Sequence, residues 1–233
     1  MKRITIARMG LGLAGALSLG VLACDVEQRD DKPELSERSI SGDSIYNVMD
    51  YGAAGNCSVD DQSDIQDAID AAVLNGGTVF FPEGCYQIGG AAVAGTSLQV
   101  DGATTLWSAG NAEIRWAGNT PSAILDIEAS DVTVRDLLFT SPENAEYAVG
   151  SEGIEVKDPS NGTLSNITIS GCEFEGFGSW AIRLTEVENF SIHENRIEHV
   201  AYGGVAVLSG SEGVISENII RDVTGDSTPK IGR

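Results

Sequence analysis

The amino-acid sequence predicts an all-β protein, a solenoid of short strands with one helix at its N-terminal end. Three observations predict this fold class. The second half of the chain repeats itself in steps of 23 residues, each copy consists of short stretches that alternate apolar and polar residues, and one helical apolar stripe comes before them. Alternation with a period of two places one face of a strand in a core and the other in solvent.

The repeat is clearest between residues 164 and 223. Isoleucine recurs at 169, 192 and 215, and three further sets follow the same step of 23: Cys172, Asn195 and Asn218; Phe174, Ile197 and Ile220; Phe177, Val200 and Val223. An earlier copy is offset by 35 residues and places Val134 and Phe139 in the roles of Ile169 and Phe174. A repeat of this length made only of short strands is typical of a β-solenoid.

Asparagines occupy equivalent turns of the repeat. Asn195 and Asn218 are expected to stack along the solenoid and to bond to backbone groups of neighbouring coils, as side-chain amides can. Asn166 and Asn189 lie in Asn-x-Ser/Thr contexts that are also glycosylation signals. We interpret them as structural turn residues too.

The stretch DDQSDIQDAIDAAVLNGG predicts a helix ahead of the repeats. Its apolar stripe comprises Ile65, Ala68, Ile69, Ala72 and Val73. Asp61 can cap its start, and Asn75-Gly76 can end it. Such a helix would cover the open first coil, whose strand edges and apolar interior need protection. TVFFPEGCYQI then predicts a strand, a turn and a second strand.

The N-terminal residues predict export. Residues 1–23 combine Lys2, Arg3 and Arg8 with a short apolar run, which is typical of a signal peptide. The ending VLAC resembles a lipobox, which implies cleavage before Cys24 and a lipid anchor on that residue. Residues 24–43 predict a disordered acidic tether, and 44–233 form the folded domain. We expect an envelope lipoprotein of the outer membrane, periplasm or cell surface, with plain secretion as the alternative.

The charge argues against one class of partner. The formal net charge is −21, and removal of the three cations of the signal makes it −24. Binding to nucleic acid needs a basic patch, so nucleic acid is excluded as a partner. A polyuronate would be repelled unless a local basic groove or a bound Ca²⁺ intervened. No cofactor is required, and the only contact expected with a membrane is through the lipid anchor.

The other cysteines are placed by their surroundings. Cys57 and Cys85 lie in loop-like contexts flanked by glycine, and an exported protein permits a disulfide between them. Cys172 stands at a repeat position that elsewhere holds asparagine, so we expect a buried free thiol there.

The N-terminal block resembles a known family. YNVMDYGAAGNCSVDDQSDIQDAIDAAVLNGGTVFFPEGCYQI (residues 46–88) contains VMDYGA, the pair Asp60-Asp61 and GGTVFFPEGCY. These motifs resemble the opening motif of the pectate-lyase-like superfamily, which includes polygalacturonases, rhamnogalacturonases, pectate lyases and phage tailspikes. The resemblance implies a right-handed parallel β-helix that acts on polysaccharide. Alone, Asp60-Asp61 could be an acid/base pair or a calcium site, but in this context we expect it to cap the helix or shape the preceding loop.

The catalytic motifs of the superfamily are not matched. Aligned with the coils of polygalacturonases, Glu152 replaces an aspartate, Ser179-Trp180 stand in place of an aspartate pair, and Gly203 stands in place of a histidine. A polygalacturonase mechanism is therefore disfavoured. The Arg-x-x-Pro-x-x-Arg pattern of one pectate lyase family and the Asp-Pro-His of alginate epimerases are absent as well.

The remaining candidates lie on the outer face of matched strands. Six aliphatic residues should point inward: Ile154, Val156, Ile182, Leu184, Val205 and Val207. Glu155, Arg183 and Lys157 then point outward as candidate catalytic residues, with Thr185 beside them. Glu152, Trp180 and Tyr202 precede the same strands and are candidate substrate-binding residues. The alternative is that all of these are ordinary solvated side chains.

No metal site is predicted. His193 alternates with Ile192 and faces outward, and neither it nor His199 has a partner at metal-ligand spacing. The leading hypothesis is an envelope-anchored glycoside hydrolase or polysaccharide lyase. The alternatives are a non-catalytic glycan-binding or adhesion protein and a truncated, inactive fragment, because GDSTPKIGR follows a complete repeat without an evident cap.

Overall fold

The computed structural model describes residues 44–89, 97–117, 123–141 and 152–224. The predicted signal peptide, the predicted lipidation site Cys24 and the predicted tether lie outside these residues. Within the described part of the chain, no helix is long and apolar enough to cross a membrane.

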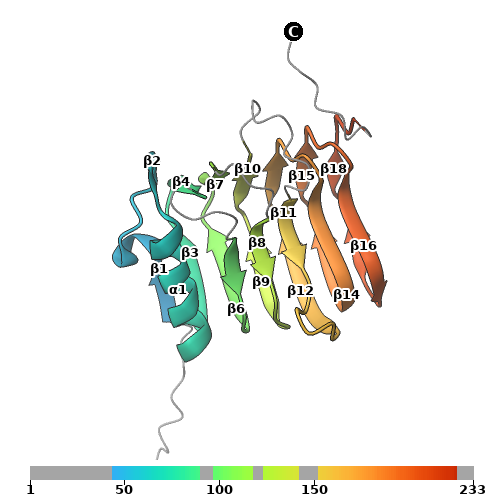
Figure 1. Cartoon of the computed structure of the whole chain (residues 1–233), viewed down its shortest axis with the longest axis horizontal. Coiled ribbons are helices and arrows are strands. Elements are labelled where there is room, and N and C mark those ends of the chain that lie inside the picture. Colours follow the sequence, from blue (N-terminus) through green and yellow to red (C-terminus); the bar gives the residue numbers. More distant parts are fainter. Residues whose placement is uncertain (1–43, 90–96, 118–122, 142–151, 225–233) are drawn as a thin grey trace, which may run out of the picture. The chain divides into compact units, whose positions relative to one another are not determined.

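The described residues form a parallel β-helix, as the sequence predicts. Every strand pair is parallel and joins one coil to the next. The coils stack in sequence order from the helix α1 to β16 and β18 (Figure 1). Strands of the same face therefore recur once per coil, which explains the 23-residue step.

Three faces surround the interior. The first contains β5 (Leu98–Val100), β8 (Ala123–Ile127), β11 (Glu152–Val156) and the first parts of β14 (Trp180–His193) and β16 (Gly203–Ser211). The second contains β1 (Ser44–Asn47), β3 (Gly77–Phe81), β6 (Thr104–Ser108), β9 (Val132–Arg135), β12 (Leu164–Ser170), the last part of β14 and β17 (Val214–Ser216). The third contains β2 (Asn56–Asp60), β4 (Gly84–Ile88), β7 (Ala112–Trp116), β10 (Leu138–Thr140), β13 (Glu173–Glu175), β15 (Arg196–Glu198) and β18 (Ile219–Ile220).

The interior is a stack of apolar side chains in register. Ile154 pairs with Leu125 and Ile182 on the first face, and the rings of Phe139 and Phe174 stack at 5.1 Å on the third. The predicted inward residues Ile154, Val156, Ile182 and Leu184 are fully buried. Such burial stabilises by about 25 cal/mol per Å² of apolar surface removed from water.

Two residues that were predicted to point inward are not fully buried in the last described coil. Val205 is half-buried, and Val207 is 36% exposed. Both belong to the inward set, but no described coil stacks on β16 on that side. Alternation predicts the direction of a side chain, whereas its burial also needs a neighbouring coil.

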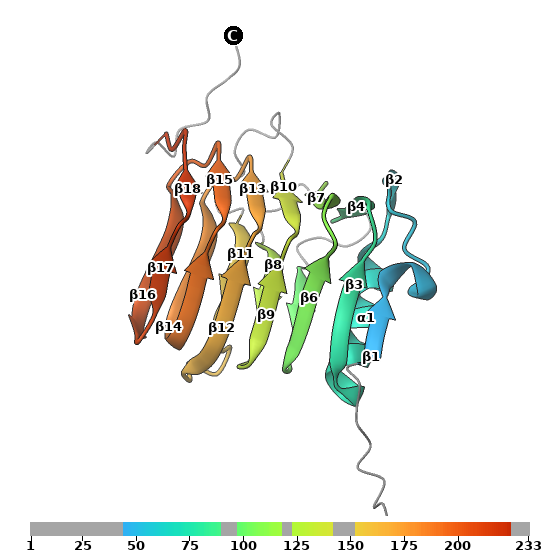
Figure 2. The same cartoon turned by 180° about the vertical axis from the view of Figure 1, so that it is seen from behind.

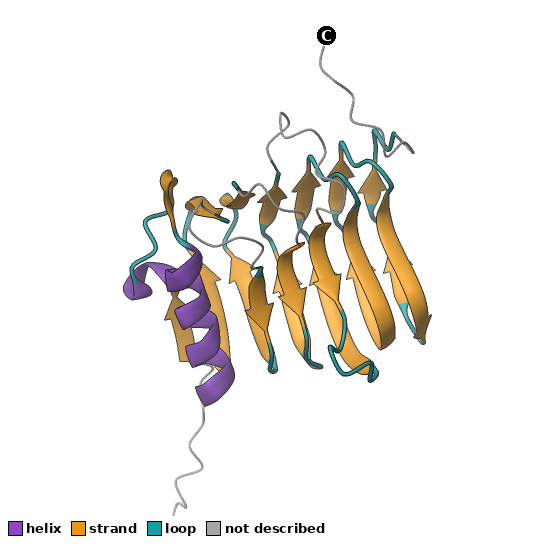
Figure 3. Ribbon diagram, in the orientation of Figure 1, coloured by secondary structure: helices purple, strands orange, loops and turns teal. Residues whose placement is uncertain are grey.

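The helix α1 (Gln62–Asn75) precedes the regular coils, purple in Figure 3. It buries Ile65, Ala68, Ile69 and Ala72, while Val73 is half-buried. Its contacts with β1, β3, β4 and β5 place it over the first coil, as predicted. Gly76, with φ of +72°, ends it.

The aspartate pair at the start of α1 is structural. Asp61 holds the N-cap position, but its carboxylate makes no capping bond, so that part of the prediction is wrong. It instead accepts hydrogen bonds from the backbone N–H groups of Ala54 (2.5 Å) and Gly55 (3.2 Å), which fixes the preceding loop. Asp60 accepts from the N–H of Gln62 at 3.2 Å. The preceding 3₁₀ helix η1 (Val48–Tyr51) is capped by Asn47.

Asparagine ladders fasten successive turns. Asn195 is 1% exposed; its Oδ1 accepts from the N–H of Cys172, and its Nδ2 donates to the Asn218 side chain and to the carbonyl of Ile169. On the surface, the amide of Asn189 donates to Asn166. Both predicted ladders are therefore confirmed. Asn166 and Asn189 have positive φ, a conformation that asparagine tolerates well.

The structure confirms the predicted states of Cys57, Cys85 and Cys172. Cys57 and Cys85 form a disulfide that links β2 to β4, with Cα atoms 4.9 Å apart. Cys172 is a buried free thiol, as expected, and burial raises its pKa to about 12. Such a thiol is unreactive near neutral pH.

The inner ladder gives the first testable prediction. Asn195→Ala leaves the buried amide of Cys172 and the carbonyl of Ile169 without their partners, so we expect a loss of about 2–3 kcal/mol in unfolding free energy. Asn218→Ala is the matched control: it occupies the same turn of the last described coil, where the side chain is half-exposed and water can replace the bonds. We expect a loss of about 1 kcal/mol there, measured by urea denaturation. Equal losses would contradict the ladder's dependence on burial.

Candidate functional site

A column of polar residues runs along the outer surface of the first face. Gln99, Asp126, Glu155 and Arg183 are paired in register on β5, β8, β11 and β14. Each lies between inward-pointing aliphatic residues of its own strand, so all four side chains leave the interior on the same side. Neighbouring strands lie about 4.8 Å apart, which brings the charged groups of adjacent coils within reach of one another.

Arg183 joins two glutamates. Its Nε donates to Glu152 at 2.9 Å, and its Nη2 donates to Glu155 at 2.5 Å. Glu152 is only 5% exposed and also accepts from the hydroxyl of Ser179 at 3.4 Å. Glu152, a candidate substrate-binding residue, is buried and bonded to Arg183, whose guanidinium it orients.

Burial dominates the electrostatics of two carboxyl groups. It raises the pKa of Glu152 to about 7, although the charge of Arg183 opposes the shift. Burial also raises the pKa of Asp126 to about 6, against a hydrogen bond from Ser97 that lowers it. The Oδ1 atom of Asp126 is buried without a hydrogen-bond partner among the described residues. Both groups can therefore hold a proton at mildly acidic pH.

A pocket opens beside this column. It has a volume of about 200 Å³ and is lined by Asp126, Ile127, Glu128, Glu155, Lys157 and Pro159. Lys157 is exposed, and no ion pair ties it to another described residue. Two of the three predicted catalytic residues, Glu155 and Lys157, thus line one pocket, and the third, Arg183, bonds to Glu155 at its edge.

Two aromatic rings form a pair at the start of β14 and in the turn before β16. The rings of Trp180 and Tyr202 stack with centroids 6.2 Å apart and 22° between their planes. Tyr202 is 42% exposed and Trp180 is half-buried. Trp180 pairs with Gly203, where a Cβ atom would come within 2.3 Å of the Trp180 ring. Glycine at 203, in place of a hydrolase's histidine, thus makes room for this ring.

The carboxylate that sequence reasoning missed is Asp126. It lies in AILDI, a stretch that aligns with the strands containing Glu155 and Arg183. The alignment alone places Asp126 one coil before Glu155, and this signal was available in the sequence. Its burial was not, because burial depends on how the neighbouring coils and the pocket residues pack around it.

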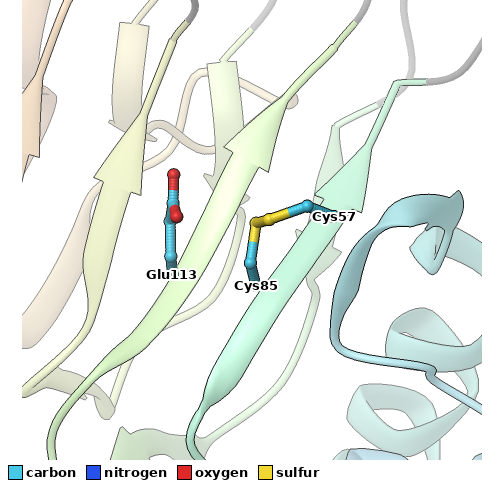
Figure 4. A group of neighbouring side chains, drawn as sticks. All are labelled: Cys57, Cys85 and Glu113. Carbon is cyan, nitrogen blue, oxygen red and sulfur yellow. A yellow bond between two sulfur atoms is a disulfide. The ribbon is translucent and has the colours of Figure 1, made fainter.

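Neither histidine belongs to a group with metal-ligand spacing among the described residues. His193 lies 3.5 Å from Glu194, and His199 lies 3.6 Å from Glu175 and 3.8 Å from Asp222, all at the surface. Among the described residues, one group has metal-ligand spacing: Cys57, Cys85 and Glu113 (Figure 4). Its two sulfur atoms are bonded to each other, so they cannot act as thiolate ligands.

The buried carboxyl of Glu152 makes stability depend on pH. Its pKa rises from 4.5 to about 7 on folding, so the folded state binds this proton more tightly than the unfolded chain. The stabilisation is therefore complete below about pH 4.5 and is lost as the pH rises through 7. We expect the melting temperature of Glu152→Gln to rise relative to wild type between pH 4.5 and 7. Glu188→Gln, at an exposed position of β14, should follow wild type throughout, and parallel curves for Glu152→Gln would refute the assignment.

Comparison with known proteins agrees with the geometry. The family described as right handed beta helix region matches residues 96–228. The family described as rhamnogalacturonase A/epimerase, pectate lyase-like, matches residues 45–118. Alginate lyase 7 of Azotobacter vinelandii is 27% identical over 191 residues, which are 74% of this chain and 21% of that protein. Mannuronan C5-epimerase AlgE2 of the same organism is 35% identical over 127 residues, 54% of this chain and 11% of that protein.

Solved structures share the fold. The A-module of the A. vinelandii epimerase AlgE4 aligns with a TM-score of 0.50 and 23% identity over 75% of this chain and 51% of that one. The Dettilon tailspike protein aligns with a TM-score of 0.53 and 10% identity over 75% and 39%. The chain spans less than a quarter of the length of either curated relative above. Because the first family covers more than half of the chain and the coils are those of its fold, the chain belongs to the right-handed β-helix family within the pectate-lyase-like superfamily.

Proposed function

We propose that the chain is a lyase-type enzyme that acts on a uronate polysaccharide in the groove along the first face. The observation that carries the proposal is the pocket in which Asp126 and Glu155 lie side by side with Lys157. It supplies a carboxyl group that holds a proton, a second carboxylate, and the ammonium of Lys157, which no ion pair ties to another described residue. The names of the similar proteins, alginate lyase and mannuronan C5-epimerase, support the same substrate class.

These groups match the steps of β-elimination. Glu155 would remove the C5 proton next to the uronate carboxylate, and Lys157 would stabilise the negative charge that develops on that carboxylate. The C4–O bond then breaks as a C4–C5 double bond forms, and the neutral carboxyl of Asp126 would give its proton to the leaving oxygen. Arg183 holds Glu155 in place, and Glu152 positions Arg183.

The aromatic pair would bind the polymer beyond the pocket. The ring of Tyr202, a residue 42% exposed, and the half-buried ring of Trp180 offer apolar surface to a sugar ring. Proton abstraction at C5 is also the first step of epimerisation, so the same residues would serve either outcome. The cation favours a uronate over a neutral sugar in this groove, despite the acidic charge of the whole chain.

A second candidate function is glycan binding without catalysis. One observation favours it: Arg183 is already bonded to two glutamates, so it is not available to neutralise a substrate carboxylate. Lys157 is then the cation on which catalysis depends, and its substitution separates the two functions.

Activity gives the next prediction. Wild type should produce unsaturated ends on alginate or pectate, or incorporate deuterium at C5 in D₂O, with kcat/KM falling as the pH rises above about 6, where Asp126 loses its proton. Asp126→Asn, Glu155→Gln and Lys157→Met should each lower kcat/KM at least about 100-fold, whereas Glu188→Gln should retain it. New reducing ends without unsaturation would indicate hydrolysis instead. Binding without either reaction would support the second candidate.

We also propose that the protein is anchored to the cell envelope through a lipid on Cys24. The support is the VLAC sequence at the end of the predicted signal peptide. Wild type expressed in bacteria should incorporate labelled palmitate and partition into the detergent phase of Triton X-114. Cys24→Ser should lose both properties, because it lacks the acceptor sulfur. Equal partitioning of the two proteins would contradict the anchor.

A further inference from the structure

The second face has an outer surface that the proposed function does not use. Three residues are paired in register on β3, β6 and β9: Phe80, Trp107 and Arg135. The residue before each of them on its strand, Val79, Leu106 or Val134, is buried, so by alternation these three side chains point outward. The strands β3, β6, β9 and β12 run side by side in Figure 2. The helix α1 lies in front of β3 in Figure 1 and behind it in Figure 2, so it leaves this surface of β3 uncovered.

The three side chains form a single platform. The rings of Phe80 and Trp107 lie 4.8 Å apart with a tilt of 43°, and the guanidinium carbon of Arg135 lies 4.5 Å from the centre of the Trp107 ring. The cation–π contact fixes the indole against the sheet. Later coils replace these groups with Ser170 and His193, so the aromatic part is confined to the earlier coils.

A hydroxyl column runs parallel to the platform. Two residues earlier on the same strands, and so on the same outer surface, Thr78, Thr105, Thr133 and Thr168 are paired in register. Their hydroxyl groups make no side-chain hydrogen bond with other described residues and are half-buried in their coils. Each can donate one hydrogen bond and accept others from a ligand.

A hollow adjoins Trp107 where its strand turns toward the third face. It has a volume of about 600 Å³ and runs across the corner from β6 and β9 to β10 and β13. Its charged lining groups are Arg135, Asp136 and Glu173. Arg135 is paired with Asp136 at 2.8 Å, which leaves the carboxylate of Glu173 in excess. A polyanion would therefore be repelled here, whereas a neutral ligand would not.

We propose that the outer surface of β3, β6 and β9, centred on Trp107, is a binding site for a neutral polysaccharide, separate from the groove of the first face. A pyranose ring presents an apolar C–H face and a rim of hydroxyls. The apolar face matches the rings of Phe80 and Trp107, and the hydroxyls match the threonine column. The site needs no catalytic group, and its existence does not depend on the activity proposed for the other face.

Native affinity electrophoresis of the full chain tests this assignment. The gels contain xylan, galactomannan, mixed-linkage β-glucan or, as the acidic probe, alginate. Wild type should be retarded by at least one neutral polymer, and Trp107→Ala should weaken that retardation at least about tenfold, as truncation of a central aromatic anchor does. Leu74→Ala, at a residue 83% exposed on α1, should bind like wild type.

Fluorescence supplies a second readout that does not depend on folding of the alanine variant. The chain has three tryptophans, and Trp116 is only 2% exposed. In Trp180→Phe, a change in emission on adding the retarding polymer therefore reports on Trp107. No retardation by any neutral polymer, or equal retardation of wild type and Trp107→Ala, would overturn the proposal. Retardation by alginate only, dependent on Trp107, would overturn the neutral class of ligand.

Discussion

Parallel pairing in register is the constraint on which the rest of this structure depends. Each residue of a coil is repeated about 4.8 Å away by its counterpart in the next, so the outer surface consists of columns rather than scattered positions. Like charges in one column would repel across that spacing. The column on the first face relieves this repulsion in two ways: Arg183 follows Glu155, and burial keeps the pKa of Asp126 raised. The chemistry of the pocket is thus partly a consequence of how the coils stack.

Competition between burial and pairing determines the state of the acidic groups. Glu152 has an arginine at 2.9 Å, yet its pKa is raised to about 7, because the loss of water outweighs the attraction of Arg183. Arg183 divides its charge between two carboxylates, and its side chain is 30% exposed. Glu155, the second carboxylate bonded to Arg183, adds a smaller increase to the pKa of Glu152.

Sequence periodicity predicts columns well and burial less well. The 23-residue step places Asn195 over Asn218, because identical spacing forces identical register. On the first face the spacing is longer, 29 residues from Asp126 to Glu155 and 28 from Glu155 to Arg183, so the register there follows from matching the strands rather than from a fixed step. Burial and side-chain bonds are harder to predict than register. Val207 is exposed because no described coil packs on its side of β16. The hydrogen bonds of Asp61 depend on the path of the preceding loop, which the sequence does not specify.

In the same architecture, the fold places few demands on which residues occupy the outer columns. In a solenoid, each coil is stabilised mainly by its inward side chains and by backbone hydrogen bonds to its two neighbouring coils. Outward side chains contribute little to either. The outward position two residues after the threonine column is occupied by Phe80, Trp107, Arg135, Ser170 and His193 in successive coils, so the fold does not demand an aromatic ring there. Two adjacent rings and a guanidinium at that position are accordingly better explained by what they bind than by what they stabilise.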